Sequence, residues 1–164
     1  MTREAGAGAT PGPMRVLPVR VRPVRPQDAS EWFRMRDALW PGTPDDHRGE
    51  IERFLRRPPP GEACLVAEDA DGRLHGFAEL RLRDVAEGCT TAPVGYLEGI
   101  YVEPEARRRG VARALVTAAE GWARAAGCGE MASDRDLDNE ASGRFHEASG
   151  FDEVVRAVHY RKAL

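Results

Sequence analysis

Hydrophobic residues recur with two different periods along this chain, and each period predicts one type of secondary structure. Apolar and β-branched residues in the stretch 96–102 are typical of a buried strand. After position 110, apolar residues return every three or four positions, which predicts a long amphipathic helix. These positions are Val111, Ala112, Leu115, Val116, Ala119, Trp122 and Ala123. The chain is therefore expected to pass from strand to helix across a short turn at 103–110.

The same patterns predict the other elements, with turn residues between them. An edge strand is expected at 15–25, because its prolines are tolerated only at a sheet edge. Asp28 is expected to cap the helix that follows, and Asp71-Gly72 is a strong hairpin signal. The remaining strands are expected at 63–68, 74–82, 130–133 and 152–161, and the helices at about 29–39, 45–57, 111–123 and 139–149. The predicted order is β-α-α-β-β-β-α-β-α-β.

Length and composition fit one domain with a full hydrophobic core. The 164 residues show no internal repeat, and 41% are hydrophobic and 31% charged. The first residues are rich in Gly, Ala, Thr and Pro, so 1–14 are expected to form a disordered extension. We therefore expect a single domain at 15–164.

Charge and cysteine usage exclude several classes of function. The formal net charge is −3, and the basic stretch 15–25 lacks the stacking aromatics of a nucleic-acid site. No apolar run approaches the roughly 20 residues of a membrane span, and the start lacks the apolar core of a signal peptide. Three scattered cysteines argue against a disulfide framework or a metal site. A cytoplasmic protein that binds no metal, nucleic acid or membrane is expected.

The turn before the long helix has the features of a diphosphate site. Backbone N–H groups at a helix start have no partner inside the helix, and the helix dipole favours negative charge there. Gly110 permits close approach of a ligand, and three arginines at 107–109 add positive charge. The patterns of the ATP-binding loop and of the dinucleotide fold are both absent. An ordinary basic helix start is the alternative interpretation.

Two motifs resemble those of the GCN5-related N-acetyltransferases (GNAT). Arg107-x-x-Gly110-x-Ala112 resembles their acyl-CoA signature, and the segment 139–151 resembles their Asn-x-x-Ala-x-x-Phe-Tyr-Glu-x-x-Gly-Phe helix. The resemblance covers the chain from about Val16 to its end. It implies an α+β, three-layer acyl-CoA N-acyltransferase fold, in which a mixed central sheet is flanked by helices.

Further stretches resemble the aminoglycoside 6'-N-acetyltransferases within that family. They are 39–42, 96–102, 131–134 and the tail 160–162. The resemblance implies direct transfer of acetyl from acetyl-CoA to the 6'-amine of an aminoglycoside, which confers antibiotic resistance. Val85 and Val155 depart from the aromatic and the acidic residue of similar members, and these departures bear on which acceptor is used. We further expect a homodimer.

Two other classes of function stay open at this stage. One is an acetyltransferase of the same fold that acts on a polyamine, another small amine or a protein N-terminus. The other is a non-catalytic acyl-CoA-binding module, which would not need acidic residues on the acceptor side.

The resemblance also implies a set of residues that bind the cosubstrate. The backbone at 100–102 would pair with the pantetheine arm, the turn at 107–113 would hold the pyrophosphate, and Asn139 would bind the arm from the next helix. His146 stands where many members have a tyrosine that protonates the thiolate, and a simply packed histidine is the alternative. The set is Ile100, Tyr101, Val102, Arg107, Arg108, Arg109, Gly110, Val111, Ala112, Arg113, Asn139 and His146.

Glu98 and Asp134 are the candidate catalytic residues. They lie at the carboxyl ends of, or within, core strands that are expected to be neighbours, on the side where ligands bind in open sheets. A carboxylate among apolar residues is costly to bury without a partner. The functional interpretation is that Asp134 orients and deprotonates the acceptor amine and Glu98 shares this role. The alternative is an ion pair with an arginine. Trp40 either packs or presents its indole face to the acceptor. We expect these three residues to bind the acceptor.

Overall fold

The computed structural model describes residues 15–42 and 44–163, and its elements form one five-stranded sheet with helices on both faces. The prediction for residues 1–14 lies outside the described residues. The strands are β1 (Arg20–Pro23), β2 (Glu62–Glu68), β3 (Leu74–Arg83), β4 (Val94–Val102) and β5 (Met131–Ser133). The helices are α1 (Ala29–Leu39), α2 (Pro44–Arg56), α3 (Val111–Ala125) and α4 (Glu140–Ala148), with short 3₁₀ turns η1 (Pro26–Asp28) and η2 (Pro104–Ala106).

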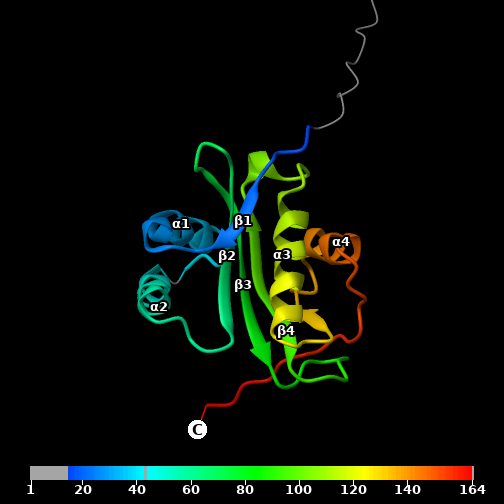
Figure 1. Ribbon diagram of the computed structural model, residues 1–164. Coiled ribbons are helices and arrows are strands. Elements are labelled where there is room, and N and C mark those ends of the chain that lie inside the picture. Colours follow the sequence, from blue (N-terminus) through cyan, green and yellow to red (C-terminus); the bar gives the residue numbers. More distant parts are fainter. Residues whose placement is uncertain (1–14, 43, 164) are drawn as a thin grey trace, which may run out of the picture.

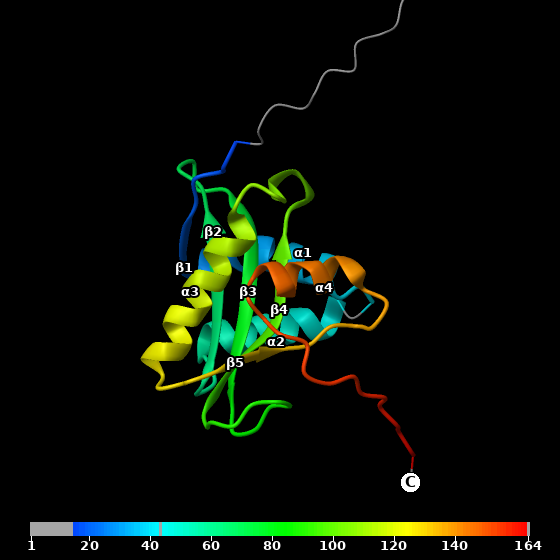
Figure 2. The same ribbon diagram turned by 90° about the vertical axis from the view of Figure 1, so that its right-hand side faces the viewer.

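Three layers build the molecule, as the sequence predicted. Helices α1 and α2 cover one face of the sheet, and α3 and α4 cover the other (Figures 1 and 2). The strands lie in the order β1-β2-β3-β4-β5, antiparallel except for the parallel pair β4–β5. This mixed sheet confirms the predicted fold class.

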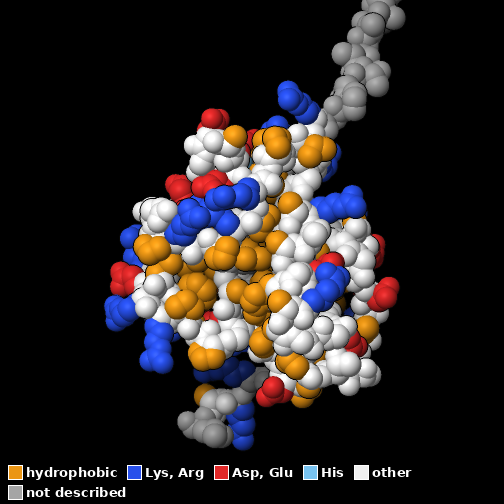
Figure 3. Space-filling model, viewed as in Figure 1, with side chains coloured by type: hydrophobic (Ala, Val, Ile, Leu, Met, Phe, Trp, Pro, Cys, Tyr) orange, Lys and Arg blue, Asp and Glu red, His pale blue; other side chains and the backbone are white. Residues whose placement is uncertain are grey.

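Alternation along β2 explains why both faces are covered. Cys64 and Val66 belong to the core on the α1–α2 side, which also contains Phe77. Leu65 and Ala67, the residues between and after them, belong to the core on the α3 side. A strand whose two faces are both apolar needs a helical layer on each of them. In the space-filling view, apolar side chains gather in the middle of the face seen in Figure 1, with charged side chains around them (Figure 3).

The edge strand β1 is shorter than predicted and is fastened by a buried arginine. The guanidinium of Arg22 donates to Asp28 at 2.6 Å and to Glu68 at 2.8 Å. The hydrogen bond from Arg22 lowers the pKa of Glu68 to about 2. Asp28 occupies the N-cap position of α1, but its carboxylate accepts from Arg22 and from the Arg25 amide instead of capping α1. The predicted helix boundary was therefore right, and the predicted capping bond was wrong.

Strands β4 and β5 separate after three residue pairs. The pairs are Gly95–Met131, Tyr96–Ala132 and Leu97–Ser133, and β5 ends there. Strand β4 continues to Val102 and stays paired with β3 on its other side. The edge of β4 that faced β5 is therefore open at 98–102 within the described part of the chain.

A β-bulge lies at the point of this separation. Glu79 pairs with Gly99 and Leu80 pairs with Leu97, so Glu98 is the extra residue of β4. A bulge bends its strand and redirects the side chain of the extra residue. The sequence pattern carried no signal for this irregularity.

The predicted last strand, 152–161, is wrong. Residues 151–163 have no regular secondary structure and extend from the body of the molecule (Figure 2). Val154, Val155 and Val158 are 62%, 56% and 73% exposed. Alternating apolar residues form a strand only where a neighbouring strand supplies hydrogen bonds, and the described part of this chain supplies none here.

Candidate active site

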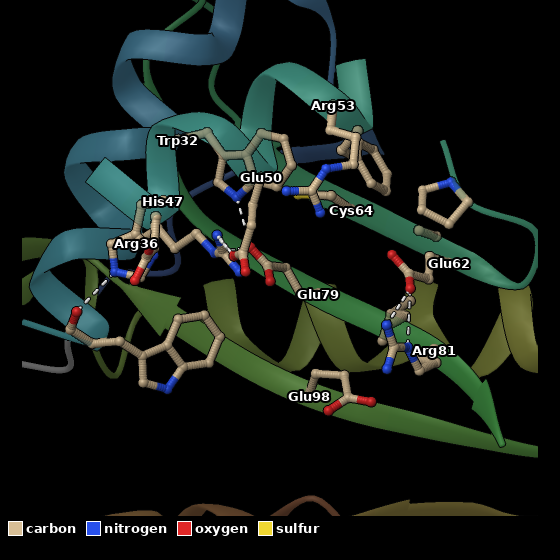
Figure 4. Close-up of a pocket in the computed structure, with 16 residues that line it drawn as sticks. Trp32, Arg36, His47, Glu50, Arg53, Glu62, Cys64, Glu79, Arg81 and Glu98 are labelled. Carbon is tan, nitrogen blue, oxygen red and sulfur yellow. Dashed lines mark hydrogen bonds and ion pairs between the residues drawn. The ribbon is translucent and has the colours of Figure 1, made fainter. Parts of the chain in front are cut away.

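A cleft of about 580 Å³ opens between α1, α2 and the strands β2, β3 and β4 (Figure 4). We call it the α1–α2 cleft. The acidic side chains that line it are Asp46, Glu50, Glu62, Glu79 and Glu98, and the basic ones are Arg36, Arg53 and Arg81. A volume of this size suits a small-molecule ligand. The excess of carboxylates favours a cationic one.

Ion pairs hold most of the arginines of this cleft. Arg36 bridges Glu50 and Glu79, and Arg81 pairs with Glu62. Burial raises the pKa of Glu79, although the ion pair with Arg36 and a 2.9 Å hydrogen bond from the Trp32 indole both favour its charged form. Glu79 was not among the residues that the sequence singled out. It lies inside an otherwise apolar strand pattern and gave no periodic signal.

Trp40 forms one wall of the cleft. It ends α1, and its indole packs on β4 so closely that a Cβ atom at Gly99 would lie 2.4 Å from the ring. Its carbonyl oxygen lies 2.9 Å from Nε2 of His47. Trp40 is half-buried and also lines the cleft, so the packing interpretation is correct without excluding contact with a ligand.

Glu98 lines the cleft from β4 and is held by an arginine. Nη2 of Arg83 donates to Oε1 and Oε2 of Glu98 at 2.9 and 2.8 Å, and Nε donates to Oε1 at 3.1 Å. The Cζ atom of Arg83 lies 3.3 Å from the ring centroid of Tyr96. The ion-pair alternative considered for Glu98 is therefore present. Sequence reasoning missed Arg83, which is one of 24 basic residues and lies 15 positions from its partner.

Asp134 follows β5 directly and accepts a hydrogen bond from the Tyr96 hydroxyl at 2.9 Å. Burial, together with this bond to the carboxylate, raises the pKa of Tyr96. Tyr96 therefore stays a neutral donor to Asp134. The two predicted catalytic carboxylates are thus connected through Tyr96 and Arg83, on adjacent strands.

The turn before α3 leaves backbone donors available. Gly110 is the N-cap with φ +88°, and no side chain caps the helix start. Arg108 also has a left-handed backbone, with φ +57°. A glycine in this conformation leaves the helix N-terminus open to an anion. Arg108 and Arg113 have no ion-pair partner in the part of the chain that the structure describes.

The other two arginines of the turn fasten it to neighbouring backbone. Nε of Arg107 donates to the Val102 carbonyl at 3.0 Å, and Nε of Arg109 donates to the Arg15 carbonyl at 3.2 Å. The predicted basic cluster thus divides into two arginines that hold the turn and two, Arg108 and Arg113, that have no side-chain partner among the described residues. Val111 and Ala112 begin α3, and the open edge of β4 at Ile100, Tyr101 and Val102 leads into this turn.

Helix α4 places Asn139 and His146 beyond Asp134. Asn139 caps the helix by accepting from the Ser142 amide at 3.0 Å, so its side-chain oxygen is engaged. Nδ1 of His146 lies 2.7 Å from the Ser142 carbonyl, and Nε2 lies 2.9 Å from Oγ of Ser133. A carbonyl only accepts, so Nδ1 carries a proton. Both ring nitrogens have protein partners, which agrees with the packed alternative for His146.

Other residues named from the sequence lie apart from these contacts. Val85 is 81% exposed in the loop after β3, and Val155 belongs to the tail. The three cysteines are free thiols. Within residues 15–42 and 44–163, no group of His, Cys, Asp or Glu is arranged to hold a metal ion, and no helix is long and apolar enough to cross a membrane.

Comparison with known proteins gives consistent matches. The model of the acetyltransferase (GNAT) family matches residues 29–151. Aminoglycoside N(6')-acetyltransferase type 1 of Klebsiella aerogenes is 50% identical over 149 residues, which are 88% of this chain and 96% of that protein. The protein of the same name from Serratia marcescens is 45% identical over 81% of this chain and 91% of its own length.

A solved structure has the same arrangement of elements. AAC(6')-Iy in complex with the bisubstrate analogue CoA-S-monomethyl-acetylneamine superposes with a TM-score of 0.82 at 39% identity. The match covers 89% of this chain and 99% of that one.

Proposed function

The chain belongs to the acetyltransferase (GNAT) family, and we propose that it is an aminoglycoside 6'-N-acetyltransferase that uses acetyl-CoA. The observation that carries this proposal is the 50% identity to the Klebsiella aerogenes enzyme across 96% of that enzyme. The acid-rich α1–α2 cleft supports it, because aminoglycosides carry several ammonium groups.

The turn at 107–113 suits the phosphates of acetyl-CoA. Its helix start has no side-chain cap, and Gly110 places no Cβ toward the ligand. Arg108 and Arg113 are available as charged partners, while Arg107 and Arg109 hold the turn in place. We assign the pantetheine arm to the open edge of β4 at 100–102. There β5 no longer pairs with β4, and the amides of the arm take its place as hydrogen-bond partners of the β4 backbone.

The acceptor side supplies a base and a binding surface for the amine. An amine attacks a thioester only after it has lost its proton. We assign this proton to Asp134, directly or through water, with Glu98 as a second anchor for ammonium groups and Trp40 as a wall against the sugar. The nitrogen then attacks the acetyl carbon and gives up a second proton as the amide forms. The bond from the acetyl carbon to sulfur breaks, and the thiolate takes up this proton and leaves as coenzyme A.

The proposal is tested by the position that receives the acetyl group. Thiol release should be fast with kanamycin or tobramycin, which carry a 6'-amine, and absent with analogues that carry a 6'-hydroxyl. The product should bear its acetyl group on the 6'-nitrogen, as read by NMR. Equal turnover of a 6'-hydroxyl analogue would reject the proposal. Much faster turnover of spermidine would establish a polyamine acetyltransferase instead.

We also propose a cytoplasmic homodimer. Free cysteines and a cosubstrate made inside the cell support the cytoplasm. For the dimer, the support is twofold: the exposed apolar tail with Val154, Val155, Val158 and Tyr160, and the short strand β5, which has a partner on one side only in the described part of the chain.

The dimer is tested by removing the tail after Phe151, which packs on His146 and is kept. Sedimentation velocity should give twice the mass of one chain for the full-length protein and the mass of one chain for the truncated protein. Circular dichroism of the truncated protein checks that the core remains folded. A full-length chain that is monomeric at every concentration, or a truncated chain that still dimerises, would refute this role of the tail.

A further inference from the structure

Arg83 makes the contacts by which proteins usually bind a cationic ligand. Its guanidinium lies between the carboxylate of Glu98 and the ring of Tyr96, and Tyr96 in turn holds Asp134. A carboxylate together with an aromatic face is a typical binding site for an organic cation. In the free protein, this site beside the α1–α2 cleft is therefore filled by a cation of the chain itself.

The position of Arg83 allows it to leave this site. It is the last residue of β3, and the loop 84–93 follows. The side chains of Arg83 and Glu98 are 35% and 28% exposed, so their ion pair is in contact with solvent. Such pairs contribute little net stability, because water and salt compete for both partners. Arg83 has no other hydrogen bond among the described residues.

Glu98 is the residue for which Arg83 and an acceptor would compete. Its bulged position on β4 directs it into the α1–α2 cleft, which Trp40 also lines (Figure 4). A carboxylate offers two oxygens, and Arg83 contacts both. An ammonium group therefore gains full access to Glu98 only when the guanidinium moves.

We propose that Arg83 is an internal competitor of the acceptor, which occupies Glu98 in the free enzyme and is displaced when an ammonium group of the aminoglycoside binds there. The inference rests on the proposed function and names a residue that limits acceptor affinity. Displacement of Arg83 from Glu98 costs the same free energy for every acceptor. An amine with only this one ion pair therefore loses the largest part of its affinity, whereas a polycation keeps its contacts with the other carboxylates of the cleft.

A double-mutant cycle tests the competition directly. Kanamycin is titrated by calorimetry into the full chain in the presence of coenzyme A, so that no acetyl transfer follows. Arg83→Gln should lower the Kd for kanamycin about two- to fivefold, the range expected from the loss of a partly exposed competing ion pair. In the Glu98→Gln background, the same Arg83→Gln change should alter Kd less than twofold.

Two further variants separate competition from a general change in charge. Arg53→Gln removes one positive charge from the same cleft without freeing Glu98, and its effect on Kd should be equal in both backgrounds. Arg83→Lys keeps the charge but loses the planar fork, so its Kd should lie between the wild-type and Arg83→Gln values. If the Arg83→Gln protein melts at a lower temperature than the wild type, Arg83→Lys replaces it as the test.

The outcomes distinguish this inference from the proposed function. Weaker kanamycin binding by Arg83→Gln, or an equal gain with and without Glu98, overturns the competitor role while the function stands. A wild-type protein that neither binds nor acetylates any aminoglycoside rejects the function and this inference with it. A gain in affinity that depends on Glu98 supports both.

Discussion

Asp134→Asn is expected to lower kcat/KM for the aminoglycoside by about 10²-fold or more, which is the usual range for removal of a general base. The asparagine keeps the size of the side chain and an oxygen that accepts from the Tyr96 hydroxyl, now 2.9 Å from Asp134. It removes the negative charge and the site for the proton. Initial rates of thiol release over a range of kanamycin concentrations measure the loss in kcat/KM. The KM for acetyl-CoA should stay near the wild-type value.

The control for Asp134→Asn is Asp152→Asn, which removes the same charge from the exposed segment after α4 and should leave kcat/KM unchanged. Melting curves separate the two interpretations of Asp134. A merely structural carboxylate would give a lower Tm and normal turnover in the protein that remains folded. An Asp134→Asn protein that is stable and fully active would transfer the role of base to Glu98.

Gly110→Asp is expected to weaken acetyl-CoA binding by more than about 10²-fold, because like charges brought together in a binding site cost several kcal/mol. The added carboxylate would lie at the N-terminus of α3, where the proposal places the pyrophosphate. The backbone at Gly110, with φ +88°, is also unfavourable for any side chain. Calorimetric titration with acetyl-CoA measures the effect.

Gly110→Ala separates the charge from the backbone strain. A Cβ atom there would meet Val16 at 3.4 Å, an ordinary contact, so alanine fits except for its dihedral angle. Its affinity for acetyl-CoA should fall only a few-fold, in line with a strain of about 1 kcal/mol. A folded Gly110→Asp protein with unchanged affinity would reject the phosphate assignment for this turn.

The local periods of the sequence predicted most of the fold. The alternation before position 103 and the helical spacing after 110 correspond to β4 and α3 in the structure. The proline-bearing segment 15–25 contains the edge strand β1, although only Arg20–Pro23 pair with β2. These features depend on residues close in the chain, which either face a core or face water. A hydrophobic pattern reports that difference directly.

The tail shows where the pattern alone misleads. Residues 152–161 alternate as a strand does, yet in this chain they have no neighbouring strand and stay exposed. Periodicity reports the two faces of a segment but not whether another strand is present to pair with it. That condition depends on parts of the molecule, or of a second molecule, that are remote in sequence.

In the candidate site, too, some features follow from the local sequence and others depend on segments that are remote in sequence. The sequence by itself determined the residue types: a glycine at a helix start, arginines around it, and two acids, one within a strand and one at the end of a neighbouring strand. Only the tertiary structure decided their partners. The bulge that turns Glu98 out of the regular register, the Arg83 guanidinium that holds it and the Tyr96 hydroxyl that holds Asp134 all join separate strands or their ends. Such contacts depend on strand register and side-chain direction in three dimensions, and a one-residue shift of register changes them without altering the hydrophobic pattern that predicts the strands.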